Sequence, residues 1–165
     1  MNTPNLKAAI ITVSDKGSRG ERADTSGPAL RAILEADGWS VIHSEIVPDD
    51  IPAIEAALIN CADNLKVPLV LTTGGTGFTQ RDNTPEATKS VIERETPGFP
   101  ELMRAESFKL TPNGILSRAV AGIRGGTIII NLPGSERAAS ECLGFIQKPL
   151  KHAIIMTAND SVEHV

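Results

Sequence analysis

Three short apolar runs along the chain predict buried β-strands. They cover Ala8–Val13, Leu69–Leu71 and Thr127–Leu132, and each is too short for a typical helix. Their residues do not alternate between apolar and polar types, which is typical of parallel strands that are covered on both faces. Trp39–Val47 is a further strand candidate. The pattern therefore favours a mostly parallel sheet.

The segments between these strands carry apolar residues at helical spacing. We expect helices over residues 25–37, 51–64, 85–95, 99–108 and 136–147. Residues 151–156 are expected to form a last strand or a short helix, and residues 159–165 a frayed tail. Because strands and helices alternate, we expect an α/β fold whose central sheet is flanked by helices on both faces. The length of 165 residues predicts a single domain, residues 1–165.

Polar residues follow several predicted strands at the point where each strand ends. Ser14, Asp15 and Lys16 follow the first strand, and Asp49 and Asp50 follow the second. Since ligands bind beyond the carboxyl ends of strands in open α/β sheets, we expect one site along this edge. Asp50 is explained as the cap of the next helix, whereas Asp49 has no local role and is a candidate for ligand or metal contact. For the first loop the alternative is a solvated loop without a ligand.

A glycine-rich stretch comes directly after the Leu69–Leu71 strand. It consists of Thr73, Gly74, Gly75, Thr76 and Gly77. Arg81 and Asp82 follow, and Thr84 with Pro85 marks the start of a helix. Exposed amide groups beside a helix N-terminus favour an anionic ligand. The alternative is a tight turn without a ligand, because neither the P-loop nor the dinucleotide-binding fingerprint is matched.

Two later segments add candidates for the same site. Ser117 and Arg118 are suited to phosphate binding, because arginine makes bidentate contacts. The alternative for Arg118 is a surface cation. The turn of Pro133, Gly134 and Ser135 joins the last predicted strand to a helix that Ser135 can cap, which repeats the arrangement at the glycine-rich stretch.

Composition narrows the classes of function. The net charge is −4 and there is no basic tract, which argues against duplex nucleic acid as a partner. One Trp, four Phe and no Tyr offer no stacking platform for single strands. Cys61 and Cys142 are expected in the core, and His43 is expected to be structural. The sequence has no signal segment and no apolar run long enough to span a membrane, so we expect a soluble, cytoplasmic protein.

The candidate side chains fit phosphoryl or nucleotidyl transfer. Two separated carboxylates, Asp49 and Asp82, stand among cations, hydroxyl groups and glycine amides. Such reactions require that phosphates be positioned and that developing charge be stabilised, with little covalent help from the protein. Mg²⁺ typically binds one or two protein carboxylates in such sites, so Asp49 and Asp82 are its candidate ligands.

Several motifs together resemble the molybdopterin adenylyltransferase family, which includes the G domain of gephyrin and its plant counterpart. They are SDKGSRGERADTSGPAL, IVPDD, TTGGTGFTQRDNTPEAT, ERETPGF and LSRAVAGIRGGTIIINLPGS, and they span about residues 8–157 in the family's order. The resemblance implies a three-layer α/β domain that forms a homotrimer. It also implies transfer of AMP from Mg-ATP to the terminal phosphate of molybdopterin, with release of pyrophosphate.

The resemblance also assigns roles to particular residues. It implies that Asp49 and Asp82 are the essential carboxylates. It implies that the substrates are bound by Ser14, Asp15, Thr73, Gly74, Gly75, Thr76, Gly77, Arg81, Ser117, Arg118, Pro133, Gly134 and Ser135. The chain has no metal-insertion domain, so that partner would be a separate protein. Two alternatives are a molybdopterin carrier without catalysis and a trimeric scaffold, and the presence of both aspartates favours the enzyme.

Overall fold

A computed structural model describes residues 6–159 of the chain. It contains a six-stranded sheet with the order β2-β1-β3-β6-β5-β4. The strands are β1 Lys7–Val13, β2 Ser40–Val47, β3 Leu69–Thr73, β4 Arg94–Glu95, β5 Ala121–Arg124 and β6 Thr127–Leu132. The first four in the sheet order are parallel, and β5 and β4 pair antiparallel at the far edge. The expected mostly parallel sheet is confirmed.

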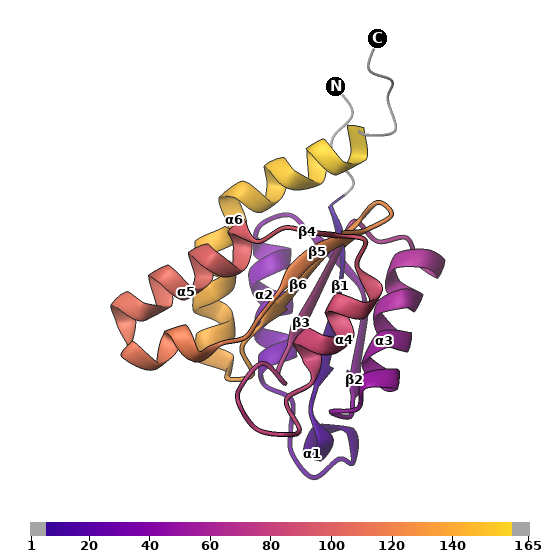
Figure 1. Ribbon diagram of the computed structural model, residues 1–165. Coiled ribbons are helices and arrows are strands. Elements are labelled where there is room, and N and C mark those ends of the chain that lie inside the picture. Colours follow the sequence, from indigo (N-terminus) through magenta and orange to yellow (C-terminus); the bar gives the residue numbers. More distant parts are fainter. Residues whose placement is uncertain (1–5, 160–165) are drawn as a thin grey trace.

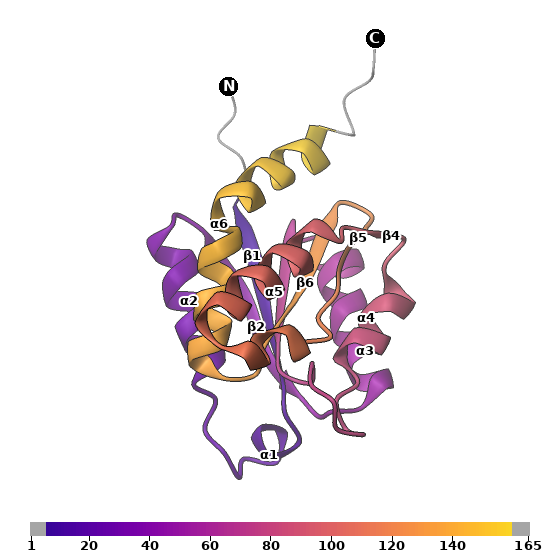
Figure 2. The same ribbon diagram turned by 60° about the vertical axis from the view of Figure 1, so that its left-hand side comes forward.

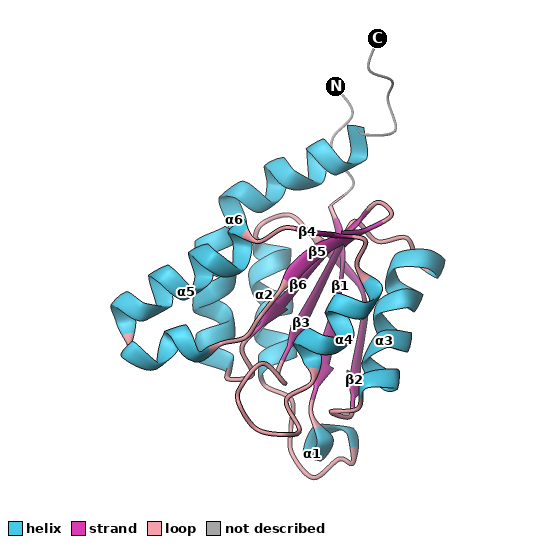
Figure 3. Cartoon of the chain, in the orientation of Figure 1, coloured by secondary structure: helices cyan, strands magenta, loops and turns pink. Residues whose placement is uncertain are grey.

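Helices cover both faces of this sheet (Figures 1 and 2). They are α1 Asp15–Ser18, α2 Ser26–Ala36, α3 Ile51–Ile59, α4 Thr84–Val91, α5 Gly98–Leu110 and α6 Glu136–Asn159, with a π-helical turn η1 Asn60–Asn64 and a 3₁₀ turn η2 Pro112–Leu116. Figure 3 shows α2, α5 and α6 on one side of the strands and α3 and α4 on the other. The protein therefore has the three layers that the sequence motifs imply.

Two hydrophobic cores lie on the two faces of the sheet. The α2 core contains Leu30 and Leu34 of α2, and the α3 core contains Ile54 and Leu58 of α3. Alternate residues of β1 pack into the two cores, which explains why this strand is apolar at almost every position. Each fully buried aliphatic side chain contributes roughly 1.5–3 kcal/mol, so the sheet is a rigid support for the loops at its ends.

The prediction was wrong for the last part of the third expected helix. The expected helix over residues 85–95 ends at Val91, and Ile92 already has extended backbone angles. Arg94–Glu95 then pairs with Ala121–Arg124, so two short strands were not recognised in the sequence. Both segments are charged or glycine-containing and too short to show a hydrophobic period.

The sequence left two forms open for residues 151–156, a last strand or a short helix. Residues 151–156 continue α6, so this segment is helical and not a strand. Pro149 lies inside α6, where its ring removes one backbone hydrogen bond, and Figure 1 shows the C-terminal part of the helix extending past the sheet. Of the expected frayed tail, Asn159 is the last residue of α6 and residues 160–165 lie outside the described part.

Candidate functional site

The loops that follow the four parallel strands meet at one end of the sheet. After β1, the Ser14 amide donates to the carbonyl of Val47 at the end of β2 (2.9 Å). After β3, the Gly74 amide donates to the carbonyl of Leu132 at the end of β6 (3.2 Å). Thr73 Oγ1 donates to the carbonyl of Pro133 at 2.7 Å. These bonds tie neighbouring strand ends together and fix the positions of the polar loops.

Asp15 and Asp49 hold each other in place through the backbone. The Asp15 amide donates to Asp49 Oδ2 and the Asp49 amide donates to Asp15 Oδ1, each at 2.9 Å. Arg81 contacts both oxygens of Asp15 from its Nε (3.0 Å) and Nη2 (2.9 Å) atoms. The hydrogen bond from Arg81 lowers the pKa of Asp15. Burial raises the pKa of Asp49, and the nearby charges of Asp15 and Asp82 act in the same direction.

The close fit of the glycine-rich loop explains its composition. Gly74 has φ of +103° and Gly75 has φ of +66°, which side-chain-bearing residues rarely adopt. A Cβ at residue 75 would overlap Thr84 Oγ1 and would lie 3.1 Å from Asp49 Oδ1. Thr84 is buried at the start of α4 and donates from Oγ1 to the carbonyl of Gly74 at 2.9 Å. The loop therefore packs against both the helix start and a candidate catalytic carboxylate.

Asp82 is oriented by a short turn. Its Oδ2 atom accepts hydrogen bonds from the amide (2.9 Å) and the hydroxyl group (2.8 Å) of Thr79. No donor within residues 6–159 is bonded to its Oδ1 atom. One oxygen thus fixes the side chain, and the other is available for a ligand.

Arg118 holds the loop together instead of pointing into a cavity. Its Nε donates to the carbonyl of Gly77 (2.7 Å) and its Nη2 to the carbonyl of Asp82 (2.6 Å). The remaining contacts go to the carboxylate of Glu86, whose pKa is lowered by the hydrogen bond from Arg118. Because the guanidinium group is used in this way, Arg118 positions the glycine loop and Asp82.

Two adjoining cavities lie among these loops, and each has a volume of about 420 Å³. The α5 cavity lies beside α5 and η2 and has largely apolar walls, with Met103, Leu116 and Cys142 among its residues. The Asp24 cavity lies beside the loop after β1 and has mixed walls, whose polar residues include Asp24 and Asp49. The two cavities share three residues, Gly75, Asp82 and Gly134. Two ligands could therefore meet at Asp82.

The site residues expected from the sequence fall into four groups, of which the first is the shared set of Gly75, Asp82 and Gly134. Those in the Asp24 cavity alone are Ser14, Asp49, Thr73, Gly74 and Ser135. Those in the α5 cavity alone are Thr76, Gly77, Ser117 and Pro133. Asp15, Arg81 and Arg118 line neither cavity. Asp15 is bonded to Asp49, Arg81 to Asp15, and Arg118 to the carbonyl of Gly77. The structure thus brings most of the expected residues together around two spaces.

Asp24 and Arg104 are polar cavity residues that the sequence reasoning did not single out. Asp24 accepts from Thr12 Oγ1 (2.8 Å) and the Gly27 amide (3.0 Å), which anchors the start of α2. Arg104 donates to the carbonyls of Ser117 (3.2 Å) and Ala119 (2.9 Å) across the α5 cavity. Asp24 lies within one of the motifs that carry the resemblance, which was the available signal. Arg104 lies in an amphipathic helix and has no local motif.

Asp49 and Asp82 are the residues that could hold a magnesium ion. Asp49 Oδ1 and Asp82 Oδ1 receive no hydrogen bond from the described residues, and both side chains line the Asp24 cavity. Each carboxylate packs closely against a glycine. A Cβ at residue 75 would lie 3.1 Å from Asp49 Oδ1, and a Cβ at residue 77 would lie 2.9 Å from Asp82 Oδ2. Carboxylate oxygens suit Mg²⁺, which keeps several waters and substrate oxygens in its shell.

The family can be determined by comparison with known proteins. Residues 9–152 match the sequence profile described as "Probable molybdopterin binding domain". This chain belongs to that molybdopterin-binding family. The resemblance in the sequence motifs is thereby confirmed.

Curated and solved relatives agree with this assignment. The molybdopterin adenylyltransferase of Helicobacter pylori J99 is 46% identical over 140 residues, which is 84% of this chain and 80% of that protein. The Escherichia coli K12 molybdopterin adenylyltransferase is 41% identical over 145 residues, which is 87% of this chain and 73% of that protein. The crystal structure of the molybdopterin biosynthesis enzyme MoaB of Thermus thermophilus superposes with a TM-score of 0.88 at 47% identity, covering 92% of this chain and 96% of that one.

The described part of this family member has no helix that is both long and apolar enough to cross a membrane.

Proposed function

We propose that this chain is a molybdopterin adenylyltransferase, which transfers AMP from Mg-ATP to the terminal phosphate of molybdopterin and releases pyrophosphate. Two curated relatives that carry this name are more than 40% identical over most of the chain. The observation that carries the proposal is the pair of adjoining cavities that share Gly75, Asp82 and Gly134. A transferase for two phosphate-bearing substrates needs two such spaces that meet at the reacting groups.

The proposed reaction forms one P–O bond and breaks another. A terminal phosphate oxygen of molybdopterin attacks the α-phosphorus of ATP and forms a new P–O bond. The bond from the α-phosphorus to the oxygen that bridges to the β-phosphorus breaks, and pyrophosphate leaves with that oxygen. No oxidant and no covalent enzyme intermediate are required.

The protein's contribution is positioning and charge stabilisation. Gly75 and Gly134 allow phosphate groups to approach the backbone between the cavities, and the N-terminus of α4 lies next to this point. Asp49 and Asp82 would hold Mg²⁺, which supplies neutralisation of phosphate charge when bound. Asp15 and Arg81 keep Asp49 oriented, and Arg118 keeps the glycine loop and Asp82 in place.

Three further properties belong to this proposal. The resemblance implies a homotrimer, a separate metal-insertion protein that receives the product, and a cytoplasmic location. The structure describes one chain, so each of these stays a prediction. Sedimentation of the purified protein would measure the first, and co-purification with a metal-insertion protein the second.

Pyrophosphate release by the purified chain tests the proposed reaction. We expect release from Mg-ATP when molybdopterin is present and only a background rate when it is absent. Tight molybdopterin binding without pyrophosphate release would indicate a carrier and contradict the enzyme. Absence of molybdopterin binding would contradict the assigned substrate.

A further inference from the structure

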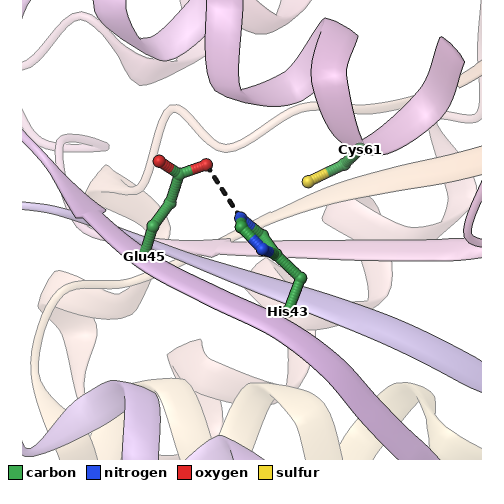
Figure 4. Close-up of side chains that lie close together, drawn as sticks. All are labelled: His43, Glu45 and Cys61. Atoms are coloured by element: carbon green, nitrogen blue, oxygen red, sulfur yellow. Dashed lines mark hydrogen bonds and ion pairs between the residues drawn. The ribbon is translucent and has the colours of Figure 1, made fainter. Parts of the chain in front are cut away.

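Three side chains outside the two cavities converge between β2 and the end of α3. They are His43 and Glu45 of β2 and Cys61 of η1. One ligand atom from each lies within 4.8 Å of the other two, and residues 6–159 contain no other set of three such residues. Figure 4 shows the Cys61 sulfur directed from the helical segment toward the histidine ring, which also meets Glu45. His43 Nε2 lies 3.0 Å from Glu45 Oε1.

A β-bulge in β2 directs His43 toward Cys61. Val41 packs in the α2 core on one face of the sheet. The register with β1 then shifts, so that Ala9 pairs with His43 and Ile42 is an extra residue. Ala9 belongs to the α3 core, together with Cys61. Because Ala9 and Ile11 face the α3 core, the extra residue places their partners His43 and Glu45 on the α3 face, which is how bulges re-aim side chains.

Cys61 is poorly suited to other roles of a thiol. It is buried, and burial raises the pKa of its thiol to about 12, so it is not an activated nucleophile. The other cysteine, Cys142, packs in the α2 core on the far side of the sheet and cannot form a disulfide with it. The sulfur atom nevertheless lies beside an imidazole and a carboxylate, which are both metal ligands.

We propose that His43, Glu45 and Cys61 bind a divalent transition metal of the zinc class. Thiolate, imidazole and carboxylate together are typical zinc ligands, whereas Mg²⁺ does not select sulfur or nitrogen. The His43 and Glu45 side chains are 29% and 35% exposed, so water can reach the fourth position. On binding, a metal–sulfur bond forms and the thiol proton passes to solvent, with no change in oxidation state. The proposal does not rest on adenylyl transfer.

A metal at this position would connect an edge strand to the helix that covers it. β2 is at one edge of the sheet, where no other strand within residues 6–159 pairs with its outer backbone groups. Cys61 lies in a π-helical turn, a feature that is rare and frequently found at functional sites. A bound ion would link the strand and this turn and stabilise the folded protein, because the unfolded chain does not hold the three ligands together.

Titration of the purified protein with Co²⁺ and Zn²⁺ alone tests the site. We expect one Co²⁺ ion to bind with a near-ultraviolet thiolate-to-cobalt absorption, which only a cysteine ligand produces. Zn²⁺ should displace the cobalt and raise the melting temperature, and a chelator should reverse the rise. Absence of the thiolate absorption in the wild-type protein would overturn the proposal, even if metal binds at carboxylates elsewhere.

Variants assign the absorption to these residues. Cys61→Ser should abolish it, whereas the matched Cys142→Ser variant should retain it. Because Cys61 is fully buried and its replacement could impair folding, His43→Gln and Glu45→Gln on the partly exposed strand provide a second test. Each should weaken cobalt binding by at least about tenfold. Unchanged affinity in both strand variants, or loss of the absorption in Cys142→Ser, would contradict the assignment.

Discussion

Asp15 and Asp49 exchange hydrogen bonds, each accepting from the other's backbone amide at 2.9 Å. The two residues follow neighbouring strands, β1 and β2, and lie 34 positions apart in the sequence. Their pKa values move in opposite directions, since Arg81 lowers that of Asp15 and burial raises that of Asp49. One carboxylate is therefore fixed as an anchor, while the other is held facing the Asp24 cavity at a cost in stability.

Asp49→Asn is expected to stabilise the protein at neutral pH. The raised folded-state pKa of Asp49 means that ionising its carboxyl group disfavours the folded state, and this penalty grows as pH rises above the unfolded-state pKa of about 3.8. Asparagine removes the charge and can still accept the hydrogen bond from Asp15. Urea unfolding of both proteins should show a larger free energy of unfolding for the variant at pH 7 and no difference near pH 3. Lower stability of the variant at pH 7 would contradict this account.

The Asp15–Arg81 pair predicts the opposite dependence on pH. Because the folded-state pKa of Asp15 is lowered, its ion pair stabilises the protein above the unfolded-state pKa and is lost as pH falls through the folded value. Arg81→Gln should therefore lower the melting temperature at neutral pH and have little effect in strong acid. An equal effect at both pH values would show that Arg81 acts through packing and not through charge.

Gly75→Ala should destabilise the protein more than Gly20→Ala. Both glycines have positive φ, +66° and +72°, so the backbone strain of alanine is similar, about 1 kcal/mol or more. A Cβ at residue 75 would also overlap Thr84 Oγ1, whereas a Cβ at residue 20 would meet nothing within 4 Å. Denaturant unfolding of the two variants isolates the close contact. Equal losses of stability would mean that the loop can move away from the helix start without cost.

Arg118→Lys should loosen the glycine loop. A lysine cannot reproduce the separate hydrogen bonds to the carbonyls of Gly77 and Asp82 and to the Glu86 carboxylate. We expect a loss of about 1–2 kcal/mol in stability and faster hydrogen exchange of the loop amides. Arg137→Lys is the control, because the Arg137 side chain is 86% exposed and pairs only with Glu141 among the described residues. Unchanged loop exchange in Arg118→Lys would remove Arg118 from its positioning role.

The parallel part of the fold could be predicted because its strands are buried on both faces. Ala8–Val13 and Thr127–Leu132 are apolar at nearly every position for this reason. Arg94–Glu95 could not be recognised, because a two-residue strand has no period and is defined only by its partner at the far edge of the sheet. The continuation of α6 through Pro149 depends on packing of residues beyond it, such as Leu150 and Ile154, against the α2 core.

The candidate site could be predicted as a set of loops but not as two cavities. Ser14, Asp49 and Gly74 stand at strand ends, and the topology alone brings such positions together. The role of Arg118 could not be read from sequence, since only the structure shows that its donors are used by backbone carbonyls. The bulge at Ile42 likewise has no sequence signal, although it determines which face His43 occupies.

Asp82 is the residue on which adenylyl transfer should depend most. Asp82→Asn keeps an acceptor for the Thr79 amide and removes the charge between the two cavities. Turnover should fall by about 10²-fold or more, with melting temperature and molybdopterin affinity close to those of the wild type. Glu101→Gln, an exposed position of α5 outside both cavities, should retain full activity.

The fate of the α-phosphorus tests the central claim most directly. Wild-type protein is incubated with molybdopterin and Mg-ATP labelled at the α-phosphorus, and the products are separated. We predict that the label moves to the molybdopterin product in proportion to the pyrophosphate released, and that Asp82→Asn greatly slows this transfer. Label found only in free AMP or unreacted ATP, despite bound molybdopterin, would contradict the assignment of this chain as an adenylyltransferase.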